Sequence, residues 1–190
     1  LPNLSGNIFF GNSLLNPEQV ETKNQTEVNP FDFSKLRFDV IVGNPPYMKS
    51  EDMKNITPLE LPLYKTNYDS AYKQFDKYFL FLEQGINLLA DDGILGYIVP
   101  SKFTKVGAGL KLRELLADKE YLHSIVSFGA NQVFADKTTY TCLLILSKKP
   151  QKTFKYAEVK SLKSWKVREP EAVKYASKNT NELDGEVWVL

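Results

Sequence analysis

Four consecutive residues, Asn44-Pro45-Pro46-Tyr47, combine groups that could hold a planar amino group. The Asn44 amide oxygen and the Pro45 carbonyl are two neighbouring acceptors, and an exocyclic amino group offers two N–H donors to match them. The adjacent prolines fix φ at about −65° and lack N–H groups, so the loop is stiff. Tyr47 adds an aromatic face against which a flat base can stack. The segment therefore predicts a binding site for an amino group on a planar ring.

The same groups also suggest a reaction. Accepting both hydrogens would draw the nitrogen lone pair out of conjugation with the ring and direct it at an electrophile. Because an amide is no general base at neutral pH, the predicted catalysis works through positioning and polarisation. The alternative is a rigid turn after a core strand. Adjacent prolines arise by chance at roughly one site in 400, and the flanking Asn44 and Tyr47 make the functional interpretation the stronger one.

The surrounding chain predicts alternating strands and helices. Alternating or continuous apolar runs predict strands at 7–10, 38–42, 94–99, 121–128, 138–146 and 153–159. Apolar residues spaced three and four apart predict helices at 71–90 and 110–117. Residues 48–68 are polar and contain two prolines, which predicts a long loop. Gly93 is expected to end the first helix as a left-handed cap.

This order of elements predicts the fold class. Apolar strands that alternate with helices indicate an α/β domain with a mostly parallel sheet and helices on both faces. Ligands of such sheets bind at the carboxyl ends of the strands. Asn44 directly follows the expected strand 38–42, so the sequence places the amino-binding segment where this fold class builds its sites.

Composition narrows the class of protein. The 190 residues are 43% hydrophobic and 25% charged, as in ordinary globular domains. The longest apolar run, Thr141 to Leu146, has the length of a strand, so we expect no membrane span. No secretory leader is visible, and the single cysteine, Cys142, fits a reducing, cytoplasmic setting. With one cysteine and one histidine, we expect no metal site.

Charge is unevenly distributed along the chain. Residues 1–100 carry 8 basic and 13 acidic side chains, a balance of −5, whereas residues 101–190 carry 16 and 10, a balance of +6. A basic stretch with interleaved aromatic residues favours a phosphate-bearing partner, although a solvated surface is the alternative. Lys49, Lys54 and Lys65 follow Tyr47 in the expected loop. They are candidates for phosphate contacts, with an ordinary solvated loop as the alternative.

The segment from Phe38 to Tyr47 resembles the catalytic motif of amino-group methyltransferases. Further segments resemble the gamma class of N6-adenine DNA methyltransferases, which includes those fused into restriction–modification enzymes. These segments are 7–15, 91–103, 112–116 and the Val133-Phe134 pair, so the resemblance spans about residues 7–150. It implies a Rossmann-like methyltransferase fold and S-adenosylmethionine as the cofactor.

The resemblance also implies roles for individual residues. Asn44 and Pro45 would hold the amino group of an adenine flipped out of double-stranded DNA, while Tyr47 and Phe134 would sandwich its ring. Asn12, Ser13 and Asn44 would lie beside the cofactor. For Asn12 a simple turn residue, and for Phe134 a packed loop residue, are the alternatives.

The sequence departs from the family pattern in one respect. The family's glycine-rich loop and the acidic end of its second strand do not appear before Asn7, and the G-x-G at 107–109 is a poor substitute because no strand precedes it. We therefore expect a fragment whose N-terminal strands are missing. Residues 1–150 would be the C-terminal part of the catalytic domain, and residues 151–190 would lead to an absent target-recognition domain. Such a fragment should be inactive alone.

Two other functions stay open at this stage. Methyltransferases that act on protein glutamine or on RNA use the same four residues. A degenerate domain could instead bind DNA without catalysis, which would also fit the missing glycine loop. The long segment 48–68 and the aromatic Phe134 favour DNA as the substrate.

Overall fold

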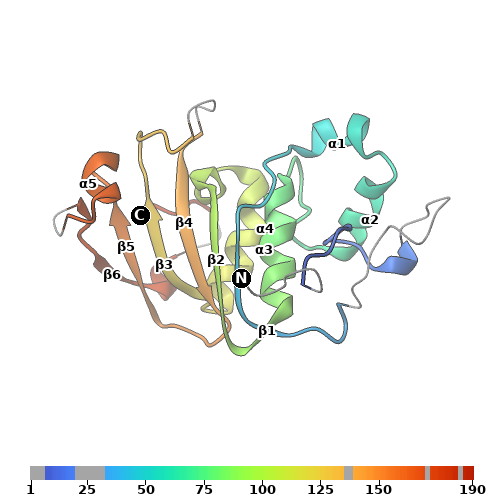
Figure 1. Ribbon diagram of the computed structural model, residues 1–190, viewed down its shortest axis with the longest axis horizontal. Coiled ribbons are helices and arrows are strands. Elements are labelled where there is room, and N and C mark those ends of the chain that lie inside the picture. Colours follow the sequence, from blue (N-terminus) through green and yellow to red (C-terminus); the bar gives the residue numbers. More distant parts are fainter. Residues whose placement is uncertain (1–6, 20–32, 135–138, 170–171, 184–185) are drawn as a thin grey trace.

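A six-stranded sheet forms the centre of the computed structural model, which describes residues 7–19, 33–134, 139–169, 172–183 and 186–190 (Figure 1). The strands lie in the order β1-β2-β4-β3-β5-β6. Their bounds are Phe38–Gly43 for β1, Leu89–Pro100 for β2, Leu122–Ser127 for β3, Thr141–Ser147 for β4, Thr153–Glu158 for β5 and Ala176–Asn179 for β6. Residues beyond position 150 therefore extend the same sheet.

The sheet is mixed. The pairs β1–β2 and β3–β5 are parallel, whereas β4 pairs antiparallel with both β2 and β3, and β6 pairs antiparallel with β5. Four strands, β1, β2, β3 and β5, consequently run in one direction and two run against them. The expected α/β class is confirmed. Of the two strands that run against the other four, β4 lies inside the sheet and β6 lies at its edge.

Helices cover both faces of this sheet. The helices are α1 (Ser50–Ile56), α2 (Glu60–Asn67), α3 (Lys77–Leu88), α4 (Leu110–Asp118) and α5 (Leu162–Lys166). Figure 1 shows α3 and α4 behind the sheet. The buried side chains of α3 and α4 join the main core with the strands. On the other face, Trp165 of α5 packs edge-on against Phe128, with ring centroids 5.8 Å apart.

The contact between α3 and β2 requires a glycine. Gly85 lies on α3, and a Cβ built there would come within 2.3 Å of the Leu95 side chain and 3.3 Å of the Tyr97 hydroxyl. Such a contact is shorter than any normal packing distance. The absence of a side chain at Gly85 therefore lets α3 approach β2 closely at Leu95 and Tyr97.

Residues 48–68 differ from the sequence prediction. They form two short helices, α1 and α2, in place of a long loop. Each buries only two residues, so their apolar periodicity is too weak to read from the sequence. Pro62 also suggested a loop, but it lies in the first turn of α2, where a missing N–H breaks no helical hydrogen bond.

Two smaller expectations were also wrong. Residues 7–10 form no strand, and Ile8 and Phe10 are exposed. Gly93 is no left-handed cap, because α3 ends at Leu88 and β2 begins at the next residue. Gly93 lies inside β2, beside an irregularity in the β1–β2 register, and a Cβ there would meet the Phe38 carbonyl at 2.8 Å. The helix expected at 110–117 and the strands expected at 38–42, 121–128, 138–146 and 153–159 are confirmed to within three residues, although position 138 lies outside the described residues. The helix expected at 71–90 begins only at Lys77, and the strand expected at 94–99 already begins at Leu89. Strand β6 was not predicted.

A buried arginine links α4 to the segments around it. The Arg113 side chain is 1% exposed and donates to the carbonyls of Phe103, at 2.6 Å, and Val106, at 2.8 Å, and also to that of Glu186. The Phe103 ring packs edge-on against Trp188, with centroids 6.0 Å apart. This one side chain therefore joins the turn after β2 to the last residues of the chain.

We expect Arg113→Met to lower the free energy of unfolding by about 3 kcal/mol, because buried carbonyls lose a charged donor. Urea unfolding of the chain would measure the change. Lys111→Met on the same helix is the matched control, since Lys111 forms a surface ion pair with Glu114; it should leave the urea midpoint close to that of the wild type. Equal effects of the two substitutions would contradict the linking role of Arg113.

Candidate active site

The segment Asn44-Pro45-Pro46-Tyr47 begins where β1 ends, at the carboxyl edge of the sheet. Asn44 is exposed, Pro45 is buried and Tyr47 is half-buried. Among the described residues, no donor bonds to the Pro45 carbonyl. The chain then pairs with the residues that lead into α3: the amide of Ser50 donates to the Phe75 carbonyl at 2.8 Å, and that of Lys77 donates to the Met48 carbonyl at 2.7 Å. The segment is thus held at both ends.

Tyr47 lies between the Asn44 side chain and β2. Its hydroxyl is 2.8 Å from Asn44 Oδ1 and 2.9 Å from the carbonyl oxygen of Ile98. Its ring packs edge-on against the Tyr78 ring, with centroids 6.1 Å apart. Partial burial raises the pKa of Tyr47 to about 12, so the hydroxyl stays protonated at neutral pH. The structure therefore brings together the three predicted catalytic residues, Asn44, Pro45 and Tyr47.

A cavity of about 680 Å³ opens beside Tyr47. This volume is within the usual range for small-molecule sites. Its walls carry Lys49, Asp76, Pro100, Lys102 and Tyr140. Lys102 forms an ion pair with Asp76 at 2.8 Å. Lys49 and Lys105 also line the wall. A cavity with a tyrosine on one side and several lysines on its rim could take an aromatic, phosphate-bearing ligand.

The three lysines predicted from the sequence fall in different places. Lys49 lines the cavity beside Tyr47. Lys54 on α1 and Lys65 on α2 are exposed and do not line it. Lys102 and Lys105, which do line it, were missed by the sequence reasoning. Their position after β2, at the same sheet edge as Asn44, was the available signal.

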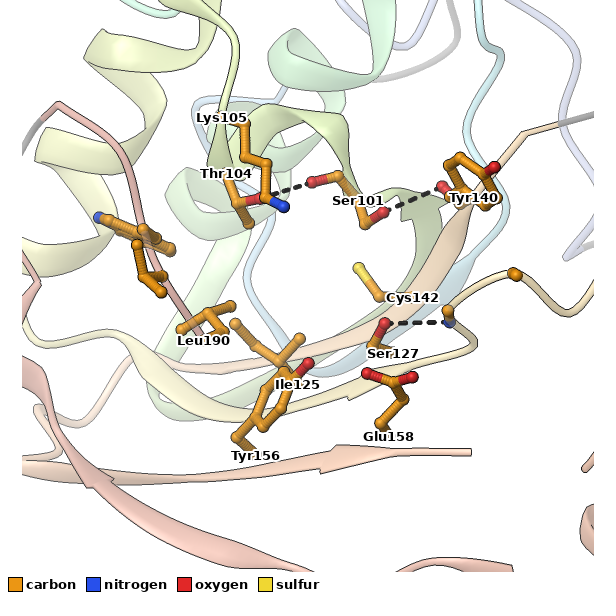
Figure 2. Close-up of a pocket in the computed structure, with 14 residues that line it drawn as sticks. Ser101, Thr104, Lys105, Ile125, Ser127, Tyr140, Cys142, Tyr156, Glu158 and Leu190 are labelled. Atoms are coloured by element: carbon orange, nitrogen blue, oxygen red, sulfur yellow. Dashed lines mark hydrogen bonds between the residues drawn. The ribbon is translucent and has the colours of Figure 1, made fainter. Parts of the chain in front are cut away.

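A second cavity, of about 390 Å³, adjoins the first (Figure 2). The two cavities share Ser101, Thr104, Lys105 and Tyr140. Figure 2 shows the Glu158 carboxylate near Ser127 on the opposite side of this second cavity. The Tyr140 side chain is 64% exposed, where the two cavities meet. Sequence reasoning missed this aromatic residue because it lies inside the strand expected at 138–146.

Phe134 lies apart from both cavities. It is half-buried in the segment after β3, and its neighbour Val133 packs against the cluster of Val126, Phe128 and Val159. Phe134 lines neither the cavity beside Tyr47 nor the second one. Its role in stacking on the target base stays a prediction.

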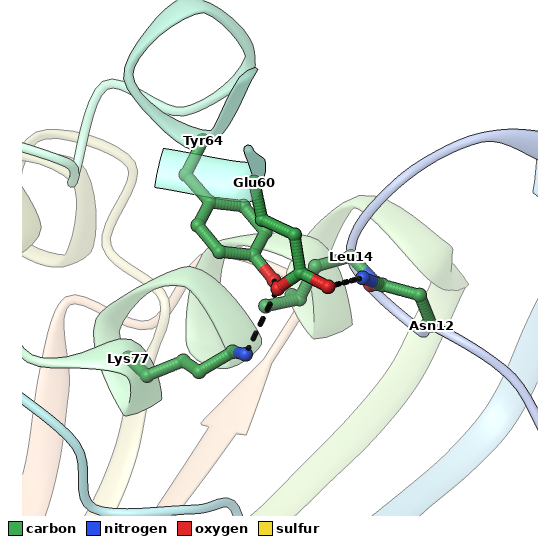
Figure 3. Close-up of polar contacts among 5 residues, drawn as sticks. All are labelled: Asn12, Leu14, Glu60, Tyr64 and Lys77. Atoms are coloured by element: carbon green, nitrogen blue, oxygen red, sulfur yellow. Dashed lines mark hydrogen bonds and ion pairs between the residues drawn. The ribbon is translucent and has the colours of Figure 1, made fainter. Parts of the chain in front are cut away.

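Asn12 is held in a polar network with α2 and α3 (Figure 3). Its Nδ2 donates to Glu60 Oε1 at 3.1 Å, and its Oδ1 accepts from the Leu14 amide at 2.9 Å. Glu60 Oε2 accepts from the Tyr64 hydroxyl at 2.6 Å and lies 3.5 Å from Lys77 Nζ. The Asn12 side chain and the turn that it forms with Leu14 are therefore both held in place. Ser13 is exposed, beside the buried Leu14.

Across the ranges that the structure describes, no group of histidine, cysteine and acidic side chains could hold a metal ion. Across the same ranges, no helix is both long and apolar enough to cross a membrane.

Comparisons with known proteins identify related sequences and similar folds. A family model described as "Eco57I restriction-modification methylase" matches residues 2–134. The Escherichia coli protein "Type II restriction enzyme and methyltransferase RM.Eco57I" is 51% identical over all of this chain. The Geobacillus stearothermophilus protein "Type II methyltransferase M.BstVI" is 30% identical over 60% of it. The chain spans 19% and 20% of the lengths of these two relatives.

Solved structures share the fold. The type IIG restriction endonuclease BpuSI superposes with a TM-score of 0.58 and 17% identity, over 82% of this chain and 21% of that one. A putative class I S-adenosylmethionine-dependent methyltransferase from Listeria monocytogenes gives a TM-score of 0.53 and 21% identity, over 71% of this chain and 41% of that one.

The fold is thus shared with the class of S-adenosylmethionine-dependent methyltransferases, whose cofactor is the one predicted from the sequence. Within this class, the chain belongs to the Eco57I restriction-modification methylase family.

The raised pKa of Tyr47 has a measurable consequence. Its folded pKa of about 12 lies above the ordinary value of 10.0, so its contribution to stability is complete below pH 10 and is lost as the pH rises toward 12. We expect Tyr47→Phe to reduce the loss of stability between pH 10 and pH 12, as measured by the urea midpoint at each pH. An identical loss in the variant and the wild type would show that Tyr47 ionises normally in the folded chain.

Proposed function

We propose that this chain is part of a site-specific DNA methyltransferase that transfers a methyl group from S-adenosylmethionine to N6 of an adenine flipped out of double-stranded DNA. The observation that carries the proposal is the arrangement of Asn44, Pro45 and Tyr47 at the carboxyl end of β1. An exposed amide, a carbonyl with no donor among the described residues and a tyrosine ring lie within four consecutive residues, and the tyrosine lines a cavity. The match to restriction–modification relatives supports DNA as the substrate.

The chemistry needs two acceptors and a platform. Asn44 Oδ1 and the Pro45 carbonyl accept hydrogen bonds from the two N6–H groups and direct the nitrogen lone pair away from the ring. The Tyr47 ring stacks on the base, and Phe134 supplies the second aromatic face in the proposal. When bound, S-adenosylmethionine supplies an electrophilic methyl group on a sulfonium. Since neither acceptor removes a proton at neutral pH, one N6 proton leaves to water after transfer.

The residues proposed to hold the cofactor suit it in part. Asn44 and Ser13 are exposed and offer polar groups. Asn12 already uses its amide oxygen and nitrogen within the chain, so it acts by shaping the turn through Glu60 and Leu14. We propose that Asn12 and Ser13 form a wall beside the cofactor's adenine and that Asn44 lies between cofactor and target base.

We further propose that a longer chain performs the reaction. The face of β1 and β2 opposite α3 exposes Val40 (64%), Val42 (77%) and Ile94 (41%), which is a large apolar surface for two adjacent strands. A glycine-loop segment and its strands would cover this face, and a target-recognition domain would read the DNA sequence. On this proposal residues 1–150 belong to the catalytic domain, residues 151–190 lead toward the recognition domain, and residues 1–190 alone lack activity.

Asn44→Ala in the longer enzyme should lower methyl transfer to duplex DNA by about 100-fold or more, because it removes a preorganised acceptor. Transfer of labelled methyl groups from S-adenosylmethionine would measure this, with RNA and a protein extract as other acceptors. Label in adenine of DNA, lost in the variant, supports the proposal. Label only in RNA or protein would mean that the substrate is RNA or protein and not DNA. No label in any acceptor would favour a binding module without catalysis.

The lysines allow a second test. Lys49→Gln should weaken binding to DNA of any sequence and lower the slope of log affinity against log salt by about one, because a phosphate contact is lost. Lys65→Gln is the matched control, since it removes the same charge outside the cavity. Binding measured by fluorescence anisotropy at several salt concentrations separates the two. An equal change in slope for both variants would argue against a specific contact at Lys49.

A further inference from the structure

The Tyr47 hydroxyl has more acceptors than protons. It lies 2.8 Å from Asn44 Oδ1 and 2.9 Å from the Ile98 carbonyl oxygen, and both distances are those of good hydrogen bonds. A phenol has a single proton to donate. One of the two contacts must therefore be satisfied in another way.

The Ile98 carbonyl has the stronger requirement for that proton. The register of β1 against β2 ends at the pair Gly43–Tyr97, so Ile98 is the first residue of β2 beyond its last partner on β1. Its bond to the Tyr47 hydroxyl is partly buried, whereas the contact with Asn44 is exposed. A buried carbonyl without a donor is costly. The Tyr47 hydroxyl thus donates one further hydrogen bond to β2 beyond the last paired residues of β1 and β2. It keeps its proton because burial raises the pKa of Tyr47.

With that proton used on Ile98, the hydroxyl oxygen can only accept from Asn44. A side-chain amide has nearly the same shape after a half-turn that exchanges its oxygen and its NH2 group, and its hydrogen-bond partners decide which orientation is present. The stable arrangement has Asn44 Nδ2 donating to Tyr47, which turns Oδ1 away from the tyrosine. This is the orientation in which Oδ1 remains available to a substrate amino group.

We infer that the Tyr47 hydroxyl, fixed by the Ile98 carbonyl, is a positioning group that orients the Asn44 amide so that its oxygen faces the substrate amino group. The inference rests on the proposed function and adds to it a role for the hydroxyl that is separate from stacking by the ring. If the amide were reversed, the Asn44 NH2 group would face the amino group of the target base. That amino group would then lose one of its two acceptors.

A double-mutant cycle in the longer enzyme tests this role. Tyr47→Phe keeps the ring and removes the hydroxyl, so single-turnover methylation should fall about tenfold. DNA affinity and the fluorescence of 2-aminopurine at the target position, which reports base flipping, should stay near their wild-type values. The matched control is Tyr175→Phe, which removes the hydroxyl of an exposed tyrosine between α5 and β6 and should leave the rate unchanged.

The second side of the cycle uses Asn44→Asp. A carboxylate has two equivalent oxygens and no orientation to set, so Tyr47→Phe should slow the Asn44→Asp enzyme by no more than about twofold. The same tenfold loss in both backgrounds would assign the hydroxyl a general structural role and overturn the inference. An unchanged rate for Tyr47→Phe alone would overturn it as well, even if Asn44→Asp proves inactive. Wild-type enzyme that transfers no methyl group to DNA would instead overturn the proposed function.

Discussion

The parallel pairing of β1 with β2 is the constraint on which the candidate site depends. The pairing ends at Gly43 and Tyr97, and the next residues on the two strands are Asn44 and Ile98. Because the strands are parallel, both chains leave the sheet at the same edge, and the stiff segment after β1 passes beside the end of β2. The bond from Tyr47 to Ile98 follows from this geometry. The antiparallel β4 does not disturb it, since β4 lies on the other side of β2.

The sequence predicted the part of the site that is local. Asn44, Pro45 and Tyr47 are neighbours in the chain, and a buried strand before them is visible as a run of apolar residues, so their grouping needed no tertiary information. The same holds for helix α4, whose apolar spacing is regular. The strand order could be predicted only in outline, because no feature of β4 in the sequence shows that it runs against its neighbours.

What the sequence did not reveal depends on distant contacts. Tyr140 and Lys105 reach the cavity beside Tyr47 because β2 and β4 pair there, with Pro100 opposite Thr141. Glu60 became the partner of Asn12 only because residues 60–67 form a helix, and that helix buries too few side chains to be recognised. Gly93 was misassigned for a related reason: its close approach to the Phe38 carbonyl belongs to a strand pairing, while its sequence neighbours suggested the end of a helix.

In the proposed function, catalysis depends on positioning, which accounts for so rigid a segment at this edge of the sheet. Neither an amide nor a carbonyl can take up a proton at neutral pH, so their effect on a bound amino group depends on distance and direction, and a displacement of about 1 Å can cost two orders of magnitude in rate. The structure restrains the segment at successive points: Pro45 is buried, Tyr47 bonds to β2, and Met48 and Ser50 bond to the chain entering α3. Gly85 then lets α3 approach β2. The packing of α3 on the sheet thereby helps to fix the place of the Asn44 amide and the Pro45 carbonyl, and the geometry of the site becomes a property of the core.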